Sequence, residues 1–398
     1  MKKKVIFMLI NMNIGGTEKA LLNMISKMSK EEYEICVFLL EKSGGFLRDI
    51  PDHVQIEILE EYKGIKKMYE NSPYYNVISL FKEGKFINSF MLLICYLLTK
   101  LLKDRRIYIS YLLKDCSIKY GYDIAVAYAG PMDLISCYVL KKIKARKKIQ
   151  WVHFDVTKIS FNKESESKMF KKFSKIFVVS EEGKTKLISM IPAIKNKVEV
   201  FPNLISTELI SRKARIGNGF NDKFEGIRIL TVGRLSGEKG QDLAIKVLAE
   251  LMKKGFNVRW YCIGEGNSRN RYEKLVEEYQ VQNEFVFLGR DSNPYPYIEQ
   301  CDIYVQPSRH EGFCITLAEA KYLNKPIVTT NFTGAKEQII DGVTGLIVST
   351  DNEKELLNGI LRLIENPDLR KNLSLNLRKV ILDSAQENKN VNELITSF

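Results

Sequence analysis

Short apolar runs alternate with helix-length amphipathic segments along almost all of the 398 residues, and this alternation constrains the fold most. In the first half the apolar runs are VIFMLI, EICVFLL, VQIEIL, DIAVAYA, KIQWVHF, KIFVVS and VEVF. In the second half they are IRILTVG, VRWYCIG, FVFLG, IYVQPS, PIVTT and GLIVS, with amphipathic segments such as DLAIKVLAELMKKG between them. Apolar strands that alternate with helices form parallel sheets covered on both faces. The pattern predicts the α/β class, with two Rossmann-like, doubly wound domains in series.

A proline marks the expected join between the two domains. The run VEVF stops at Pro202, and a polar stretch of low hydrophobicity continues to about Gly226. We therefore expect an N-terminal domain over residues 1–203 and a C-terminal domain over residues 204–383. Doubly wound sheets bind ligands beyond the carboxyl ends of their strands, so two facing domains would enclose a central cleft.

The charge of the chain favours anionic partners. Its 61 Lys and Arg residues exceed its 48 Asp and Glu residues, giving a formal charge of +13. Such a surface attracts phosphates or acidic lipids. Nucleic acid is disfavoured, because the basic residues are spread along the chain and neither zinc-finger spacing nor an RNP-type aromatic motif occurs.

The cysteines and the N-terminus indicate a cytosolic protein. Seven cysteines lie far apart, mostly inside apolar runs, and none forms a Cys-x-x-Cys pair, which is typical of reduced core thiols. The start, MKKKVIFMLINMNIGG, resembles a signal peptide in its basic end, but it alternates like a strand and leads into a glycine turn. We interpret it as the first strand.

One segment, residues 80–113, does not fit an α/β unit. It joins the unbroken apolar run Phe90–Leu98 to Lys100, Lys103, Arg105 and Arg106. The run is too short for a transmembrane helix, which needs about 20 residues. Two interpretations stay open: a buried helix with a basic exposed end, or an interfacial helix whose cations meet anionic lipid while its apolar face enters the acyl boundary.

The most informative block, SRHEGFCITLAEA, covers Ser308–Ala320 and follows the strand IYVQP. Glu311 lies in the expected loop, and Glu319 lies in the helix that follows. The free N–H groups near the helix start would bind a diphosphate, while Glu319 would accept hydrogen bonds from ribose and Glu311 from sugar hydroxyls. The donor contacts expected in this block are Glu311, Gly312, Phe313, Cys314, Ile315, Thr316 and Glu319.

A second loop, VGRLSGEKG at residues 232–240, also follows a strand and precedes a helix. Arg234 and Lys239 can both reach a diphosphate from it, while its glycines allow close backbone approach. Two cations at that point stabilise a leaving phosphate, which is the role of a metal in other transferases. No Asp-x-Asp pair occurs in the sequence. We therefore expect neither a divalent metal nor another cofactor.

Two further groups belong to the first half. Gly15 and Gly16 follow the first strand and open a helix, where backbone amides can meet a phosphate or an acceptor group. The third glycine of a dinucleotide-binding fingerprint is missing, which disfavours an NAD site. His153 ends the strand KIQWV and is a candidate for substrate contact at the edge of the sheet. Each group by itself is also compatible with a purely structural role.

In their order along nearly the whole chain, these motifs resemble glycosyltransferase family 4, which comprises retaining enzymes with the GT-B fold. The resemblance rests on the glycine turn after the first strand, the mid-chain histidine, the GRLSGEKG loop and the pair of glutamates in EGFCITLAE. The family pattern has glycine or another small residue where this chain has Cys314. That departure concerns the way in which the loop meets the phosphates.

The resemblance implies roles residue by residue. Arg234 and Lys239 would hold the diphosphate, Glu319 the ribose and Glu311 the donor sugar. Gly16 would lie near the phosphates or the acceptor, and His153 near the sugar. The loop at Gly289 and Arg290 is similar to the one that meets the base through its backbone, and residues 384–398 resemble a helix that packs back on the N-terminal domain.

The resemblance also implies a function. The chain would be a hexosyltransferase that transfers a sugar with retention from a nucleotide diphosphate donor, UDP-sugar rather than GDP-sugar favoured, to a lipid-linked or polysaccharide acceptor. The departing phosphate oxygen would take the acceptor proton, so no second carboxylate is needed as a base, unlike in glycosidases. Cell-surface polysaccharide assembly in the cytoplasm, with the membrane as a partner, is the expected setting.

Three alternatives remain open at this stage. A non-catalytic GT-B partner subunit of another transferase would keep the fold, although the loss of Glu311, Arg234 or Lys239 would be its signature. A transferase acting on protein or on some other acceptor would use the same donor residues. A nucleotide-sugar epimerase or a phosphorylase would share a similar fold, and the phosphorylase would need a lysine that binds pyridoxal phosphate.

Overall fold

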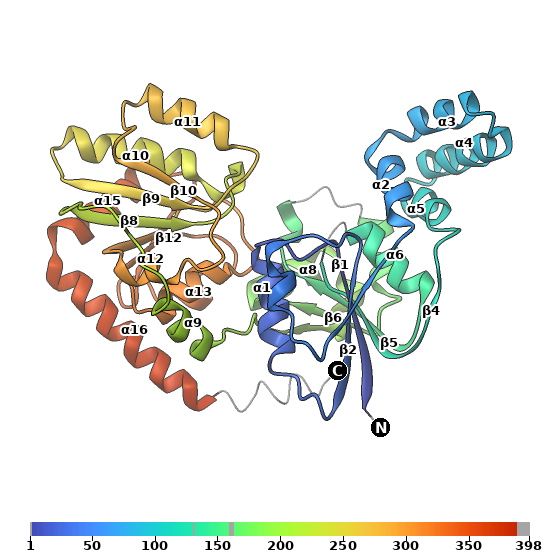
Figure 1. The fold of residues 1–398 in the computed structure, drawn as a ribbon, viewed down its shortest axis with the longest axis horizontal. Coiled ribbons are helices and arrows are strands. Elements are labelled where there is room, and N and C mark those ends of the chain that lie inside the picture. The colour runs from blue at the N-terminus through green and yellow to red at the C-terminus, as the bar shows by residue number, and fades with distance from the viewer. Residues whose placement is uncertain (1, 130–131, 159–162, 388–398) are drawn as a thin grey trace. The chain divides into compact units, whose positions relative to one another are not determined.

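The structure is a computed structural model, and it describes residues 2–129, 132–158 and 163–387. The chain forms two compact units, and its main division falls between Phe201 and Pro202. Each unit is built on one parallel sheet with helices beside it (Figure 1). The α/β class and the two sheets predicted from the sequence are confirmed.

The first unit contains a seven-stranded sheet in the order β3-β2-β1-β4-β5-β6-β7, in which all pairs are parallel. The order reverses between β1 and β4, so this is a doubly wound sheet with its switch point there. The strands are β1 (Lys3–Leu9), β2 (Tyr33–Leu39), β3 (Gln55–Ile58), β4 (Lys119–Ala127), β5 (Ile143–Val152), β6 (Lys175–Val178) and β7 (Val198–Val200).

Helices connect these strands and cover the sheet. They are α1 (Gly16–Ile25), α2 (Tyr62–Glu70), α3 (Pro73–Lys82), α4 (Phe86–Leu101), α5 (Arg106–Leu112), α6 (Met132–Lys142), α7 (Lys163–Phe170) and α8 (Glu181–Met190), with short 3-10 turns η1 (Gly45–Asp49), η2 (Val156–Lys158) and η3 (Pro192–Lys197). In β1 the residues Val5 to Leu9 are all buried. Burial on both faces explains why this strand is continuously apolar rather than alternating.

The second unit contains a six-stranded parallel sheet in the order β10-β9-β8-β11-β12-β13. Its switch point lies between β8 and β11. The strands are β8 (Ile227–Val232), β9 (Val258–Ile263), β10 (Phe285–Gly289), β11 (Ile303–Gln306), β12 (Ile327–Thr330) and β13 (Leu346–Val348). The thirteen strands of the two sheets fall on the thirteen apolar runs read from the sequence.

The helices of the second unit pack against both faces of this sheet. They are α9 (Thr207–Ala214), α10 (Gln241–Lys253), α11 (Arg269–Glu278), α12 (Tyr295–Gln300), α13 (Ile315–Tyr322), α14 (Ala335–Gln338), α15 (Glu353–Glu365) and α16 (Pro367–Glu387), with the 3-10 turn η4 (Gly237–Lys239). One apolar core joins α10, α11 and α15 to the sheet, and a second joins α12 and α13 to it. Two cores that share one sheet hold the strand ends, and the loops that follow them, in fixed positions.

The segment over residues 80–113 corrects one interpretation. It forms the end of α3, then α4 and α5, which are inserted between β3 and β4. In α4 only Ser89 and Leu92 are buried, whereas most of its apolar residues are exposed. A buried helix is therefore wrong for α4, because one narrow face satisfies its packing and the rest of its apolar surface lies outside the core.

The C-terminal prediction is tested only in part. Residues 384–387 are the end of α16, which begins at Pro367, rather than the start of a separate helix. Residues 388–398, for which packing on the N-terminal domain is predicted, lie outside the described residues. Within the described part of the chain, no helix has the length and apolar character that crossing a membrane requires.

Candidate active site

The predicted loops of the second unit meet at its switch point. Strands β8 and β11 are hydrogen-bonded neighbours, so the loop after β8 (residues 233–240) and the loop after β11 (residues 307–314) leave the same edge of the sheet. Their connections run to opposite sides of the sheet, which opens a crevice at this point in doubly wound folds. The sheet order thus brings together two motifs that lie some 70 residues apart in the sequence.

Backbone contacts fix these two loops to each other. Gly240 has φ 71°, and a Cβ added to it would lie 2.0 Å from the Pro307 carbonyl oxygen. A glycine is required there both by the left-handed conformation and by this close approach. The Arg309 amide also donates to the Glu238 carbonyl at 2.8 Å, and the Arg309 guanidinium binds both carboxylate oxygens of Asp242 at 2.8 and 3.0 Å.

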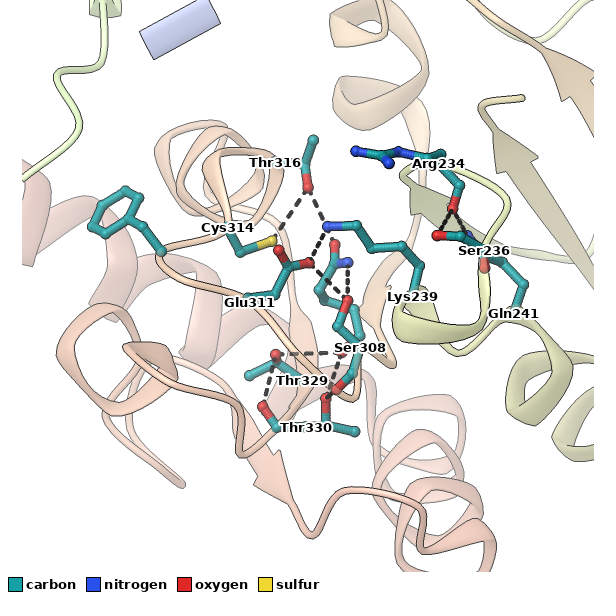
Figure 2. A network of polar contacts seen from close by, with 12 residues as sticks. Arg234, Ser236, Lys239, Gln241, Ser308, Glu311, Cys314, Thr316, Thr329 and Thr330 are labelled. Carbon is teal, nitrogen blue, oxygen red and sulfur yellow. Dashed lines mark hydrogen bonds and ion pairs between the residues drawn. The ribbon is translucent and has the colours of Figure 1, made fainter. Parts of the chain in front are cut away.

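The central contact of the site is an ion pair between the two loops. The Lys239 ammonium lies 2.6 Å from Glu311 Oε1, and both side chains are mostly buried. Ser308 Oγ donates to the same carboxylate oxygen at 2.8 Å (Figure 2). Gln306 Nε2 in turn donates to Ser308 Oγ at 2.8 Å. These contacts hold the Glu311 carboxylate between the two loops, and its Oε1 accepts hydrogen bonds from both Lys239 and Ser308.

The charge of Lys239 is maintained in spite of its burial. Burial by itself would lower its pKa, but the negative charge of Glu311 and the hydrogen bond to it outweigh burial and raise the pKa of Lys239. The ammonium has three donors and Glu311 uses one of them. Because it has further donors, the charged Lys239 can bind a phosphate oxygen while it stays paired with Glu311.

The helix start predicted near Ile315 is present. Cys314 is the N-cap of α13 and has φ 61°, a left-handed conformation that non-glycine residues seldom adopt. This explains why the family pattern places glycine or another small residue at this position. Its thiol is buried and contacts Thr316 Oγ1 at 3.4 Å. The first amides of α13 have no carbonyl partner within their own helix, so they are available to an anion.

The neighbouring loop residues are positioned by other elements. Gln338 of α14 donates its side-chain amide to the Phe313 carbonyl, and Thr316 Oγ1 donates to Gln306 Oε1 at 3.2 Å. Gly312 is buried between Glu311 and Phe313. The whole segment from Glu311 to Thr316 is thus held from several sides, as a preorganised binding loop must be.

Glu319 lies one helical turn after Ile315, on the inner side of α13. It is 1% exposed, and its Oε1 accepts a hydrogen bond from the Tyr295 hydroxyl at 3.0 Å. Tyr295 belongs to α12, so this contact also joins α12 to α13. The carboxylate therefore sits behind the helix start rather than in the network around Lys239.

The remaining predicted residues of this unit lie at the ends of neighbouring strands. Arg234 is exposed, and its guanidinium extends toward the side of the network that carries Thr316 and Lys239 (Figure 2). Gly289 ends β10 with φ 76°, and exposed Arg290 follows it. Because β10 is the outer strand of the sheet, two strands away from β8, these two residues are not part of the polar network.

His153 lies in a cavity at the switch point of the first unit. A cavity of about 70 Å³ is lined by residues that follow β1, β4 and β5, among them Thr17, Tyr128 and His153. Gly16 is the first residue of α1 and Gly15 precedes it, but both belong to the second compact unit and neither lines this cavity. The His153 ring packs edge-on against Tyr128 with 4.5 Å between centroids and stacks on Trp151.

His153 is uncharged at neutral pH. Burial lowers its pKa from 6.5 to about 3, and within the described part of the chain neither ring nitrogen has a hydrogen-bond partner. A neutral imidazole can both donate and accept a hydrogen bond. The geometry therefore suits contact with a hydroxyl group rather than charge stabilisation.

Sequence reasoning missed three residues of this site. Gln306, Ser308 and Tyr295 are buried polar residues that orient Glu311, Thr316 and Glu319. The signal for Gln306 was present, since a glutamine inside the apolar strand IYVQ needs buried partners. No sequence signal connects Tyr295 to Glu319, because they meet only through the packing of α12 against α13.

Two doubly wound domains in series are the architecture of the GT-B fold. The crystal structure of Anabaena HepE in complex with UDP and glucose shares this fold over 100% of both chains, with a TM-score of 0.71 at 17% identity. Residues 217–380 match the family model of glycosyl transferases group 1. This match lies within the C-terminal unit, which is therefore similar to the group 1 glycosyl transferases.

Two of the curated relatives are bacterial glycosyltransferases whose names specify a substrate or a pathway. The chain is 33% identical over 176 residues to N-acetylgalactosamine-N,N'-diacetylbacillosaminyl-diphospho-undecaprenol 4-alpha-N-acetylgalactosaminyltransferase of Campylobacter jejuni, covering 44% of this chain and 46% of the relative. It is 30% identical over 230 residues to the capsular polysaccharide biosynthesis glycosyltransferase CapM of Staphylococcus aureus, covering 55% and 58%. The chain thus spans about half the length of these two relatives.

Proposed function

We propose that this chain is a retaining glycosyltransferase that moves a hexosyl group from a nucleotide diphosphate, with UDP favoured, to a lipid-linked or polysaccharide acceptor. The observation that carries the proposal is the buried Lys239–Glu311 pair beside the first amides of α13. It joins a phosphate-binding cation and a hydroxyl-binding carboxylate in one fixed loop pair. UDP is favoured because HepE, which shares the fold, was crystallised with UDP.

The donor would occupy the second unit. Its diphosphate would bind Lys239, Arg234 and the amides at Ile315 and Thr316. The free lone pairs of Glu311 would accept hydrogen bonds from sugar hydroxyls. Glu319 would accept hydrogen bonds from the ribose hydroxyls after Tyr295 shifts its own hydrogen bond. The backbone at Gly289–Arg290 would accept a hydrogen bond from the base. These roles follow from charge and hydrogen-bonding capacity at the places described above.

The chemical step needs no general base from the chain. The bond between the anomeric carbon and the phosphate oxygen breaks, and the acceptor oxygen bonds to the same face of that carbon. The acceptor proton passes to the departing phosphate oxygen. Arg234 and Lys239 would stabilise the developing charge on the diphosphate, each such contact contributing about 10²–10³ in rate. We accordingly propose a reaction without a metal ion or another cofactor.

The first unit would supply the acceptor side. Neutral His153 in its cavity and the amides at Gly15 and Gly16 are suited to hydroxyl or phosphate groups. A lipid-linked acceptor is favoured by the Campylobacter jejuni relative, whose name specifies a diphospho-undecaprenol substrate. Cell-surface polysaccharide assembly is favoured by the Staphylococcus aureus relative. Transfer would take place at the inner face of the membrane.

A donor screen tests this function. The purified chain is incubated with a panel of UDP- and GDP-sugars with EDTA present, and released nucleotide is measured with and without lipid-linked acceptors. We expect one UDP-sugar to be turned over, with the anomeric configuration retained in the product by NMR. Lys239→Ala and Glu311→Gln should each lower turnover at least about 100-fold.

A matched lysine provides the control. Lys253 also forms an ion pair, with Glu250 at 2.7 Å, but on the exposed surface of α10. Lys253→Ala should therefore keep wild-type turnover. If Lys239→Ala and Glu311→Gln were as active as Lys253→Ala, the site would be wrongly assigned. If no donor of the panel were turned over by the wild type, the transferase proposal itself would fail.

A further inference from the structure

Helices α3 and α4 form an antiparallel pair inserted between β3 and β4 of the first unit, with α2 and α5 between them and the sheet (Figure 1). The pair closes through the turn between Lys82 and Phe86, where the Phe81 and Phe86 rings pack edge to face with 5.1 Å between centroids. We call this pair the α3–α4 hairpin. None of the roles proposed above uses it.

One apolar face of α4 is exposed. The exposed residues Ile87, Phe90, Met91, Ile94, Leu97, Leu98 and Leu101 recur at the three- and four-residue spacing of one helical stripe. Ile87 and Leu101, at its two ends, are 78% and 77% exposed. On the opposite side Leu92 is fully buried, and Ser89 donates to the Val77 carbonyl of α3 at 2.8 Å.

The neighbouring helix extends this surface. Tyr74, Tyr75 and Phe81 of α3 are each more than half exposed. Large contiguous apolar patches of this kind are rare on soluble monomers and mark interaction sites. Because α4 is fixed to α3 through its other face, the stripe is a fixed surface of the folded unit rather than a packing defect.

The charges around the stripe select the partner. Between Tyr74 and Arg106 the sequence has six Lys and Arg residues and two acids. The acids are already paired, Glu83 with Lys85 and Asp104 with Arg106. Cations lie at both ends of α4, Lys82 and Lys85 before it and Lys100, Lys103 and Arg105 at or after its end. An apolar stripe with cations at both ends is typical of a helix that lies in the plane of an anionic bilayer.

A cavity beside the last turn of α4 adds a more specific feature. Its volume is about 330 Å³, and Lys103, Arg105, Thr99 and the tyrosines 69, 96 and 108 are among its lining residues. The Arg105 guanidinium lies 4.8 Å from the Tyr69 ring centroid and 3.4 Å from Asp133. The buried Thr99 hydroxyl has no hydrogen-bond partner in the described part of the chain. Two cations and a hydroxyl in an aromatic cavity suit a phosphate group.

We propose that the α3–α4 hairpin is a membrane-docking element: its stripe enters the acyl boundary of an anionic bilayer, and the Lys103–Arg105 cavity takes a phospholipid headgroup phosphate. As the device that brings the chain to a lipid-linked acceptor, this inference rests on the proposed function. The binding itself needs no turnover and can be measured without it.

The first test is flotation of the full chain with vesicles of phosphatidylcholine, with or without 30% phosphatidylglycerol. Wild type should float with the anionic vesicles. The double variant Ile87→Gln/Leu101→Gln should lose at least about tenfold in partition, because it removes the two most exposed side chains of the stripe. The control Ile216→Gln/Ile340→Gln makes the same change at two isoleucines of the second unit that are also more than half exposed. It should bind as wild type does.

The second test separates the cavity from general charge attraction. Lys103→Gln/Arg105→Gln should reduce binding to anionic vesicles more than roughly 30-fold, because general attraction of about 1 kcal/mol per cation accounts for 30-fold and the loss of the headgroup contact adds to it. Lys82→Gln/Lys85→Gln removes the same charge at the other end of α4 and should reduce binding less. Lys144→Gln/Arg146→Gln removes it outside the hairpin and should have the smallest effect. Equal losses from the first two variants would overturn the headgroup cavity.

The outcomes distinguish this inference from the transferase proposal. Failure of wild type to float, or equal flotation of the stripe variant and its control, would overturn membrane docking. So would a wild-type dimer in sedimentation that the stripe variant converts to monomer, because the stripe would then be an interface between copies of the chain. Nucleotide-sugar hydrolysis without vesicles should be equal in all these variants. If the wild type floats but hydrolyses no nucleotide sugar, only the transferase proposal is refuted.

Discussion

At the scale of single residues, two glycines flank the same helix and differ only in their surroundings. Gly240 and Gly255 stand before and after α10 with φ 71° and 82°. An added Cβ would meet the Pro307 carbonyl oxygen at 2.0 Å in the first case and nothing within 4 Å in the second. A comparison of the two glycines therefore distinguishes the loss of stability caused by a left-handed Cβ from the loss caused by moving the two site loops apart.

Alanine at each glycine gives the first prediction. Gly255→Ala should lower the free energy of unfolding by about 1–2 kcal/mol, the cost of a left-handed Cβ. Gly240→Ala should cost more and should also weaken UDP binding, because Pro307 has to move away from the loop that carries Lys239. Urea denaturation and titration calorimetry measure the two effects. Equal stability losses with unchanged UDP affinity would contradict this account.

A buried carboxyl of the first unit gives a second prediction. Burial raises the pKa of Glu166 to about 7. The negative charges of Asp133 and Asp104 add to this rise, and the positive charge of Arg106 opposes it. In the unfolded chain this pKa is near 4.3. Between these values the folded chain keeps a proton that the unfolded chain releases, so this group makes the free energy of unfolding fall as pH rises from about 4.3 to 7.

Glutamine at this position should remove that fall. Glu166→Gln should gain stability relative to wild type at pH 8 compared with pH 4.5, as measured by urea denaturation across this range. Glu164→Gln, at an exposed position on the same helix, is the matched control and should leave the pH profile unchanged. A Glu166→Gln profile parallel to that of wild type would show that this carboxyl titrates normally.

At the scale of elements, a hydrogen-bond chain crosses three central strands beneath the candidate site. The Trp260 indole of β9 donates to Thr231 Oγ1 of β8 at 3.0 Å, and that hydroxyl donates to the Val305 carbonyl of β11 at 2.8 Å. All three residues are buried. These hydrogen bonds tie β9, β8 and β11 together, and the ends of β8 and β11 carry the two site loops.

Breaking this chain gives a third prediction. Thr231→Val leaves the indole N–H buried without a partner, so it should lower the free energy of unfolding by about 1–3 kcal/mol. In a Trp260→Phe background no such donor remains, and the same substitution should cost roughly 1 kcal/mol less. A double-mutant cycle by urea denaturation measures this coupling. Strict additivity would mean that the contact contributes nothing to stability.

At the scale of the whole molecule, the two units have separate cores, which predicts separate responses to ligand. The sheet of the first unit and that of the second each have their own buried cluster. UDP at 100 times its Kd should raise the free energy of opening by about 2.7 kcal/mol in the unit that binds it. Hydrogen exchange should show this protection in β8–β11 and much less in β4–β6. Equal protection of both units would indicate one cooperative molecule.

The pattern of apolar runs was enough to predict the fold class and the positions of the strands in the described part of the chain. A parallel strand covered on both faces must be continuously apolar, and its ends must carry turn residues, so this information is local. The same locality explains why the loops at residues 233–240 and 308–316 could be found. Residue type and position also predict a phosphate-binding role for Lys239 and a sugar-binding role for Glu311, and both roles stay predictions.

How these residues meet could not be predicted from the sequence. That Lys239 pairs with Glu311, that Tyr295 holds Glu319 and that Cys314 adopts a left-handed conformation depend on strand order and on helix packing, which join segments far apart in the chain. The sequence also left α4 undecided between core and membrane surface, because an apolar stripe looks the same in both. Its exposure follows from which face α3 covers, and that is a property of the folded unit alone.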